Sequence, residues 1–466
     1  GGAVDGRPPQ RRQRAQRGNG ALVRRLALLA GEQGEGVELA VERGRDVHEQ
    51  VRQEGRGQVG RVPVGFRQRL VGEDARRVVV LVRARGDEAG QEAQLVVHVD
   101  VAGMRQEQRP GREAADDPGF LRQLAELGAE AVRINCAHDD EEIWSRMIHN
   151  VRAAEKETGR RMRIFMDLAG PKIRTGATRK GEGGKHVHVG DELAIALPGR
   201  LKAVDKDLPA VECTLPEVLT AAVEGDRIHI DDGKLEVRVT RREEWGVVTE
   251  VTAGGDEKGY KLKEEKGINF PDTELDVPAL TSADRRHLGF VARHADAIEF
   301  SFAQTPQDIE QLQKALAYER PDDWRRLGLV LKIETAKAVR NLPDLIVEAA
   351  GRQPTAIMIA RGDLAVQIGF ARLAEIQEEI LWLAEAAQVP VIWATQVLES
   401  YVKTGVPSRG EMTDAAMAAR AECVMLNKGP YLLKAIPDLD RLFGRMSDHM
   451  RKKTPQLRAL QSWHDI

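Results

Sequence analysis

The feature that most constrains the fold is a series of seven short apolar segments, each followed directly by polar residues. Outside one long gap they recur about every 30 residues, the length of a strand plus the helix that returns the chain to the next parallel strand. Such apolar runs are typical of buried parallel strands. The segments are AVRIN (131–135), RIFMD (163–167), AIEFSF (297–302), LVLKIE (329–334), IMIARGD (357–363), VPVIWATQ (389–396) and ECVMLN (422–427).

Helical patterns separate these predicted strands. Apolar residues recur at helical spacing over 309–316 and over 373–383, as on the buried face of a surface helix. Asp117-Pro118 can cap and begin a further helix, with Phe120, Leu124 and Leu127 on one face.

This alternation predicts the α/β class and a (β/α)8 TIM barrel, whose active site lies at the carboxyl ends of the strands. The eighth strand must precede Asp116, and only residues 94–101 offer a suitable apolar segment.

The long gap has a different pattern. Over residues 176–267 short alternating segments are separated by Gly or Asp turns, which predicts a small β domain inserted into the larger fold. The barrel is then expected in two parts, 114–175 and 268–450, followed by a tail at 451–466. An insert at the catalytic end of a barrel is expected to act as a lid.

Residues 1–113 differ in composition from the rest, because they contain no Ser, Thr, Ile, Lys, Tyr, Trp or Cys. Three interpretations stay open: a disordered low-complexity arm rich in Arg, Gly, Gln and Val, a divergent helical domain, or a GC-rich stretch translated in the wrong frame up to about Gly111. We favour the last, because low-complexity arms usually keep Ser and Lys. We expect irregular structure here and assign it no function.

Bulk properties exclude several classes of protein. The formal net charge of −3 provides no basic field for nucleic acid. The three cysteines lie far apart without a CxxC pair, which argues against zinc or a disulfide framework. The apolar runs are too short to cross a bilayer, and no secretory signal pattern opens the sequence. We therefore expect a cytoplasmic protein without membrane contact.

Charged residues at two strand ends point to chemistry. Lys332 and Glu334 close one predicted strand, and Asp363 closes the next. Two carboxylates suit Mg²⁺, which takes its other ligands from substrate and water. A neighbouring lysine can stabilise a phosphoryl or enolate oxygen. A single acid at a strand end is often only a helix cap, so the prediction depends on the pair.

Seven motifs, in order between about residues 116 and 448, resemble those of the pyruvate kinase family. They are VRINCAHD (132–139), MDLAGPKIRTG (166–176), HIDDGKLEV (229–237), KGINFPDTELDVPALT (266–281), LKIET (331–335), IMIARGDLAVQI (357–368) and ATQVLES (394–400). The resemblance implies a TIM barrel with an inserted small β-barrel lid domain. It also implies phosphoryl transfer between phosphoenolpyruvate and ADP, giving pyruvate and ATP, with Mg²⁺ or Mn²⁺ as cofactor. The family's C-terminal regulatory domain is expected to be lacking, because the sequence ends soon after the last predicted strand.

The resemblance also implies roles for individual residues. Glu334 and Asp363 would bind the metal, while Lys332, Thr395 and Arg133 would be catalytic, Thr395 acting through a water near the enolpyruvate methylene. Substrate binding would fall to Arg133, Lys332, Gly362, Asp363 and Thr395, and nucleotide binding to Asn135, Arg174 and Lys266.

The sequence departs from the family in two places. Ala137 and Lys172 stand where K⁺-using members have Ser and Glu. The Lys172 ammonium, beside Asp167, is expected to replace the monovalent cation, so that K⁺ is not required. The last strand is followed by Asn427-Lys428-Gly429-Pro430, where the family has Ser-Gly-Glu-Thr. We expect this difference to change nucleotide binding or the identity of the phosphoryl acceptor.

Two alternative functions stay open. One is an enolate-forming, Mg²⁺-dependent lyase or aldolase on the same type of barrel. The other is a non-catalytic, pyruvate-kinase-like protein that binds phosphoenolpyruvate. A homo-oligomeric state, allosteric effectors and the nucleotide preference are left open by the sequence.

Overall fold

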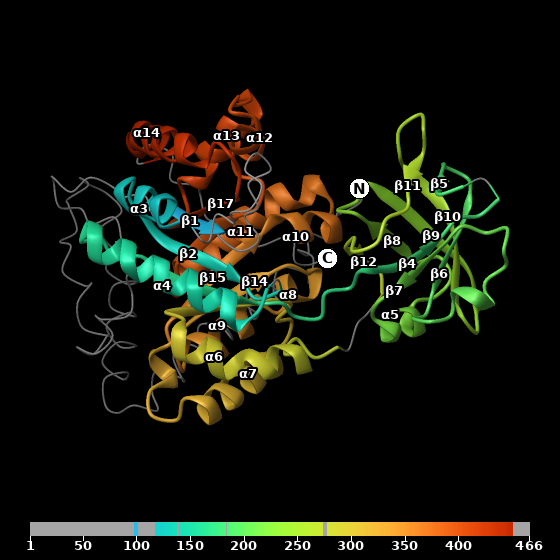
Figure 1. Cartoon of the computed structure of the whole chain (residues 1–466), viewed down its shortest axis with the longest axis horizontal. Coiled ribbons are helices and arrows are strands. Elements are labelled where there is room, and N and C mark those ends of the chain that lie inside the picture. Colours follow the sequence, from blue (N-terminus) through green and yellow to red (C-terminus); the bar gives the residue numbers. More distant parts are fainter. Residues whose placement is uncertain (1–96, 101–116, 138, 183, 274–276, 451–466) are drawn as a thin grey trace, which may run out of the picture. The chain divides into compact units, whose positions relative to one another are not determined.

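The computed structural model describes residues 97–100, 117–137, 139–182, 184–273 and 277–450, with only the backbone for 97–100 and 447–450. Within this part, eight strands form a closed barrel in the order β1-β17-β16-β15-β14-β13-β3-β2 (Figure 1). Their bounds are β1 Val97–Asp100, β2 Ala129–Asn135, β3 Arg163–Leu168, β13 Ala297–Phe300, β14 Gly328–Ile333, β15 Thr355–Ala360, β16 Val391–Ala394 and β17 Cys423–Leu426. The predicted TIM barrel is confirmed, since each of the seven apolar segments overlaps one of these strands.

The strand that closes the barrel is β1. It pairs in parallel with β17 on one side and with β2 on the other, so that His98 lies opposite Met425 and Ala131. It falls within residues 94–101, the only segment that the sequence offered for this position. The rest of residues 1–113 and the tail at 451–466 lie outside the described residues, and the interpretations given for them stay predictions.

Side chains inside the barrel form an apolar layer below a charged one. The apolar layer includes Ala131, Phe165, Ala297, Val330, Ala356, Met358, Ile392, Ala394, Cys423 and Met425. Because side chains alternate across a strand, the residue two positions further on faces the same way. On β2, β3, β13 and β14 these next positions hold Arg133, Asp167, Glu299 and Lys332. Strand geometry therefore brings four charged side chains together inside the barrel.

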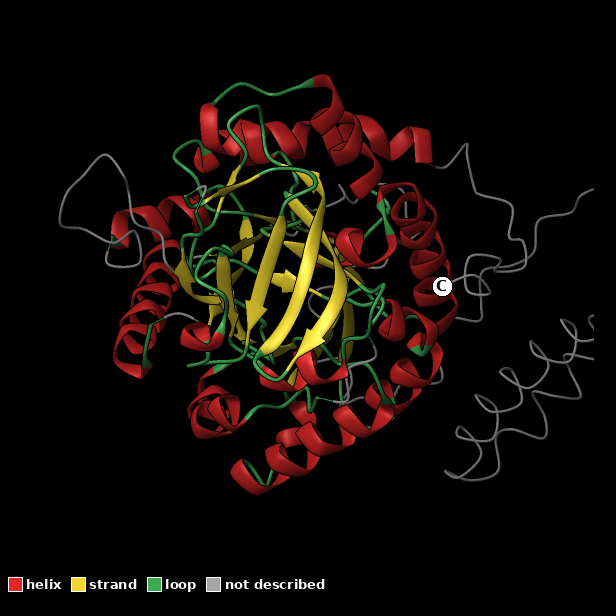
Figure 2. Cartoon of the chain, turned by 90° about the vertical axis from the view of Figure 1, so that its right-hand side faces the viewer, coloured by secondary structure: helices red, strands yellow, loops and turns green. Residues whose placement is uncertain are grey.

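Helices surround the strands (Figure 2). Their bounds are α3 Pro118–Glu126, α4 Glu141–Thr158, α6 Ser282–His294, α7 Pro306–Glu319, α8 Ala336–Arg340, α9 Leu342–Ala350, α10 Arg361–Ile368, α11 Phe370–Ala387, α12 Glu399–Thr404, α13 Arg409–Ala418 and α14 Leu432–Met450, with 3₁₀ turns at η3 Leu201–Ala203 and η4 Trp324–Arg326. No helix in the described ranges combines the length and the apolar character that crossing a bilayer requires.

The first described helix, α3, begins as predicted. The Asp117 carboxylate accepts hydrogen bonds from the amides of Gly119 and Phe120. Its predicted apolar face is partly wrong, because α3 buries Leu121 and Leu124 while Leu127 is 38% exposed. Leu127 is the residue that caps the end of the helix, where the chain turns into β2, and it no longer follows the helical face.

The inserted β domain spans Thr175–Asn269. Its strands are β4 Thr175–Arg179, β5 His186–Val187, β6 Glu192–Ala196, β7 Ala210–Cys213, β8 Arg227–Ile230, β9 Leu235–Glu243, β10 Gly246–Gly254, β11 Tyr260–Lys261 and β12 Ile268–Asn269, with one short helix, α5 Pro216–Ala221. Seven of these form one sheet in the order β12-β8-β9-β10-β6-β7-β4, and β5 pairs with β11. An isolated bridge joins Arg174 to Gly267, beside the two edge strands, so the sheet curls back on itself as a small barrel.

The pairing of β1 can be tested with His98→Pro. Proline removes an amide from a strand that pairs on both sides, and we expect the free energy of unfolding to fall by about 3 kcal/mol. Thermal unfolding followed by circular dichroism measures the change, with His98→Val, which keeps the amide, as the control. An unchanged unfolding midpoint for the proline variant would show that β1 does not close the barrel.

Candidate active site

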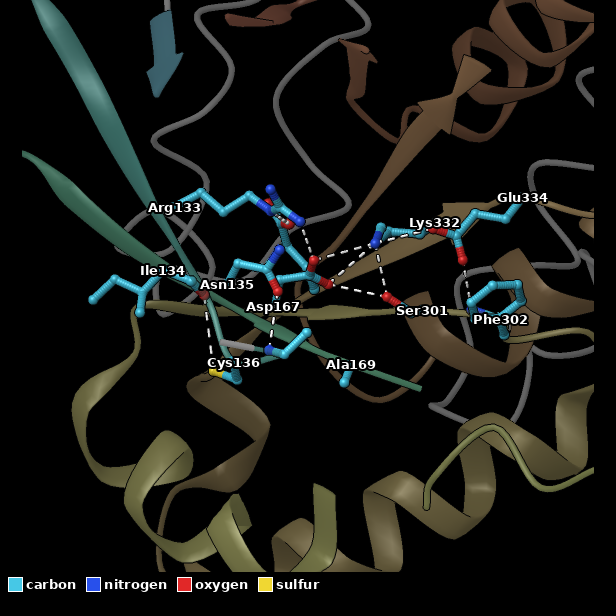
Figure 3. Close-up of polar contacts among 12 residues, drawn as sticks. Arg133, Ile134, Asn135, Cys136, Asp167, Ala169, Ser301, Phe302, Lys332 and Glu334 are labelled. Atoms are coloured by element: carbon cyan, nitrogen blue, oxygen red, sulfur yellow. Dashed lines mark hydrogen bonds and ion pairs between the residues drawn. The ribbon is translucent and has the colours of Figure 1, made fainter. Parts of the chain in front are cut away.

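Charged side chains from neighbouring strands form one buried network at the carboxyl ends of the barrel (Figure 3). Nζ of Lys332 lies 3.2 Å from both carboxylate oxygens of Asp167 and 3.0 Å from Oε1 of Glu334. Nε of Arg133 donates to Glu299 at 2.9 Å, and Nη2 of Arg133 pairs with Asp167. Asp167 therefore lies between two cations, and Lys332 lies between two carboxylates.

The network keeps both Lys332 and Asp167 charged. Burial lowers the pKa of Lys332, but the carboxylates of Asp167 and Glu334 outweigh it and raise the pKa above its ordinary value. Burial raises the pKa of Asp167, which has no exposed surface, but the charges of Arg133 and Lys332 outweigh that effect and lower the pKa. The protonated ammonium of Lys332 thus lies beside Glu334, one of the two predicted metal ligands.

Two residues of the network were missed by the sequence analysis. The Ser301 hydroxyl donates to Asp167 at 3.0 Å and accepts from Lys332 at 2.7 Å. Glu299, which pairs with Arg133, is also fully buried. Both lie in the segment AIEFSF, where a Glu inside an apolar run was the available signal, since a buried acid requires a partner.

The carboxylates of Glu334 and Asp363 fit the predicted metal site. Glu334 accepts a hydrogen bond from the amide of Phe302 at 2.9 Å, so one of its oxygens is oriented. No hydrogen bond or ion pair joins the Asp363 carboxylate to another described residue. Burial and the negative charge of Glu334 raise the pKa of Asp363 to about 6, although Lys332 and Lys172 act against this.

A shared cation relieves the repulsion between two such carboxylates. No group of three or more His, Cys, Asp or Glu residues arranged for metal binding occurs in the described part of the chain. A Mg²⁺ or Mn²⁺ ion at Glu334 and Asp363 would therefore take its other oxygen ligands from substrate and water, as Mg²⁺ commonly does.

Lys172 lies within the field of the same groups. Burial and the charge of Lys332 lower the pKa of Lys172, while Asp167 and Glu334 act to raise it. Its ammonium is thus close enough to the network to contribute positive charge there. The predicted role of Lys172 in place of K⁺ stays a prediction.

Arg133 and Asn135 are oriented by the protein itself. Arg133 is 8% exposed and uses its guanidinium for Asp167 and Glu299. Oδ1 of Asn135 accepts from the amide of Ala137 at 3.0 Å, which shapes the turn after β2. Their predicted roles in binding phosphate and nucleotide stay predictions.

Thr395 and Gly362 meet across two neighbouring strand ends. Oγ1 of Thr395 accepts a hydrogen bond from the amide of Gly362 at 2.8 Å. A Cβ atom at position 362 would come no nearer than 3.8 Å to the protein, at Oγ1 of Thr395. Packing does not demand a glycine there, and its predicted role in letting the substrate approach the backbone stays a prediction.

In the divergent segment Asn427–Pro430, after β17, packing does require a glycine. A Cβ atom at Gly429 would lie 2.5 Å from the carbonyl oxygen of Val402 in α12. Packing therefore requires a glycine at this position, and the Asn427–Pro430 segment is held against α12.

A cleft of about 840 Å³ lies between the rim of the barrel and the inserted β domain, and its lining includes four predicted site residues: Lys172, Arg174, Lys266 and Asp363. Arg174 donates to the carbonyl of Glu265 at 3.0 Å, and Nζ of Lys266 pairs with Asp231 at 3.1 Å. Pockets that bind small molecules commonly have volumes of about 300–1,000 Å³. The other predicted site residues are not among the described residues that line this cleft.

Comparison with known proteins points to a single family. A family model described as "Pyruvate kinase, barrel domain" matches residues 111–435. The pyruvate kinase of Methylorubrum extorquens is 34% identical over 341 residues, covering 71% of this chain and 66% of that protein. Pyruvate kinase 1 of Trypanosoma brucei brucei is 32% identical over 338 residues, covering 69% and 63%. A pyruvate kinase of Mycobacterium tuberculosis is 31% identical over 344 residues, covering 72% and 68%. The chain spans about two thirds of the length of these relatives.

The raised pKa of Asp363 predicts a pH-dependent stability in the absence of metal. The folded protein holds this proton up to a pH of about 6, above the ordinary carboxyl value of 3.8. The favourable contribution is therefore complete below pH 3.8 and is lost as the pH rises through 6. We expect Asp363→Asn to be more stable than the unsubstituted protein by about 2 kcal/mol at pH 7.5, and by much less at pH 4.5.

Urea unfolding at both pH values, in chelator and in MgCl₂, measures this difference. Mg²⁺ should reduce it at pH 7.5, because the ion stabilises only the protein that keeps both carboxylates. An advantage of Asp363→Asn that is independent of pH and Mg²⁺ would contradict the metal site.

Proposed function

Because the chain belongs to the pyruvate kinase family, we propose that it transfers the phosphoryl group of phosphoenolpyruvate to ADP, giving pyruvate and ATP. The observation that carries the proposal is the position of Lys332. Its ammonium is held between Asp167 and Glu334, beside a carboxylate, Asp363, that lines the cleft.

The reaction exchanges one P–O bond for another. The bond between phosphorus and the enol oxygen breaks, and phosphorus bonds to a terminal β-phosphate oxygen of ADP. The enolate left behind takes up one proton at its methylene carbon and becomes pyruvate. Mg²⁺ or Mn²⁺ at Glu334 and Asp363 would supply positive charge to the substrate oxygens.

Lys332 stabilises the charge of the phosphoryl group as it moves. Asp167 and Glu334 keep the lysine protonated, and the Ser301 hydroxyl fixes the direction of its ammonium. A donor held in place in this way needs no reorganisation during the reaction and contributes about 3–4 kcal/mol to the transition state.

Thr395 and Gly362 contribute to binding and protonating the enolpyruvate. Threonine is a poor acid, so Thr395 orients a water that delivers the proton to the methylene carbon. The hydrogen bond from the Gly362 amide fixes its hydroxyl. The glycine at position 362, which has no side chain, lets the substrate approach the backbone.

Basic residues of the cleft bind the nucleotide. Arg174 and Lys266, together with Arg133 and Asn135 at the rim, contact the phosphates of the two substrates, where guanidinium groups form paired hydrogen bonds. Lys172 contributes the charge that a monovalent cation brings in other members, so K⁺ is not required.

The proposed site of the reaction is the cytoplasm. All three cysteines are unpaired thiols, and Cys213 and Cys423 are buried, which fits a reducing cytoplasm. The partners are small phosphorylated molecules rather than nucleic acid or membrane.

The main test is a coupled assay that follows pyruvate formation from phosphoenolpyruvate and ADP with Mg²⁺. We expect Lys332→Met to lower kcat by at least about a hundredfold, because the charge at the phosphoryl group is lost. Lys314→Met is the matched control, since Lys314 is an exposed lysine that pairs with Glu310 on the same helix. Metal-dependent cleavage of a 2-keto acid without nucleotide would favour the lyase instead. Binding of phosphoenolpyruvate without any turnover would favour the non-catalytic protein.

The role of Lys172 predicts independence from K⁺. At constant ionic strength, adding K⁺ should change the rate by much less than tenfold, because an ammonium already supplies the charge. Lys172→Glu should lose most activity in Na⁺ or tetramethylammonium buffer and regain part of it in K⁺ buffer. Stimulation of the unsubstituted protein by tenfold or more would contradict this role.

A further inference from the structure

Arg361 makes an unusual set of contacts for a residue outside the predicted site. It is the first residue of α10, immediately before Gly362 and Asp363, and it is 7% exposed. Nε of Arg361 donates to the carbonyl of Ala394 at 3.0 Å, and Nη2 donates to the carbonyl of Thr395 at 2.6 Å. Its remaining amino group pairs with Asp414 of α13. Its guanidinium therefore joins α10, the end of β16 and α13.

The two carbonyl groups lie on either side of Thr395. The Ala394 carbonyl belongs to the peptide plane before Thr395, and the Thr395 carbonyl belongs to the plane after it. These two planes define the backbone angles φ and ψ of Thr395. By holding both planes, one guanidinium fixes the backbone conformation of a single residue.

That conformation requires support. Thr395 has a φ of 64°, in the left-handed region, and Gln396 and Leu398 follow with φ of 57° and 50°. A β-branched residue in this region is a strained outlier that persists only where its surroundings hold it. The contacts of Arg361 are such surroundings.

The side chain of Thr395 is held from the same segment. The amide of Gly362, the residue after Arg361, donates to Oγ1 of Thr395 at 2.8 Å. Two consecutive residues thus fix both the backbone and the hydroxyl of Thr395. The face of the ring of Trp393, 4.9 Å from Cζ of Arg361, supports the guanidinium from one side.

We propose that Arg361 is a positioning residue, which holds Thr395 in its left-handed conformation and so sets where the Thr395 hydroxyl orients the water that delivers the proton to the substrate. The planar guanidinium donates from three nitrogens in fixed directions, whereas all the donor hydrogens of a lysine lie on one nitrogen. The kinetic part of the inference rests on the proposed function, and the conformational part does not.

Hydrogen exchange tests the conformational part in the full-length protein. In Arg361→Lys and Arg361→Gln we expect amides of residues 391–400 to exchange at least tenfold faster, because the turn is no longer held. Arg420→Gln removes another largely buried arginine, paired with Glu378, and should leave these amides unchanged. Equal exchange in the Arg361 variants and in the unsubstituted protein would overturn the inference, whatever reaction the protein catalyses. If Arg361→Gln does not fold, Arg361→Lys decides.

Kinetics test the link to Thr395. Arg361→Gln should lower kcat for pyruvate formation by at least tenfold and leave KM for ADP within about twofold. In a Thr395→Ala background the same change should cost less than twofold, because the hydroxyl that Arg361 positions is already absent. Full additivity of the two losses would overturn the inference. If the unsubstituted protein forms no pyruvate, the proposed function fails and the exchange measurement alone decides on Arg361.

Discussion

The interaction on which the site depends is the buried ion network of Lys332 with Asp167 and Glu334. Inside a barrel, a lysine without a partner would lose its proton, and a lone carboxylate would gain one. Each of these charges is stable only because the others are present, and removing one partner of a buried pair commonly costs about 3–5 kcal/mol. The same mutual dependence holds a full positive charge at the carboxyl ends of the strands.

The barrel makes this network possible because apolar residues and charged residues occupy different inward-facing positions along its strands. The lower inward positions are filled by apolar and small residues such as Ala131 and Val330, and the next inward positions carry Arg133 and Lys332. The apolar layer keeps water away from the charges on one side. On the other side the inserted β domain borders the cleft. The charges are therefore screened little by solvent and act strongly on whatever binds between them.

The site also contains carboxylates and backbone that the protein alone does not satisfy. The Asp363 carboxylate repels that of Glu334 and forms no hydrogen bond or ion pair with another described residue, and Thr395 holds a strained backbone. Strain and unfavourable charge collect where a ligand can relieve them or where function uses them. By contrast, Gly429 in the divergent segment after β17 is explained by packing against Val402.

The sequence by itself determined the barrel, because the spacing of its apolar segments and the polar residues at their ends follow from local geometry. It also placed Lys332, Glu334 and Asp363 at one rim, since parallel strands end together. It did not determine which of these groups pair. Asp167 is 165 residues from Lys332 and 34 from Arg133, and only barrel closure brings the three together. The contacts of Ser301, Glu299 and Arg361 were likewise decided by tertiary structure, because a hydrogen bond depends on distances across strands that no local pattern encodes.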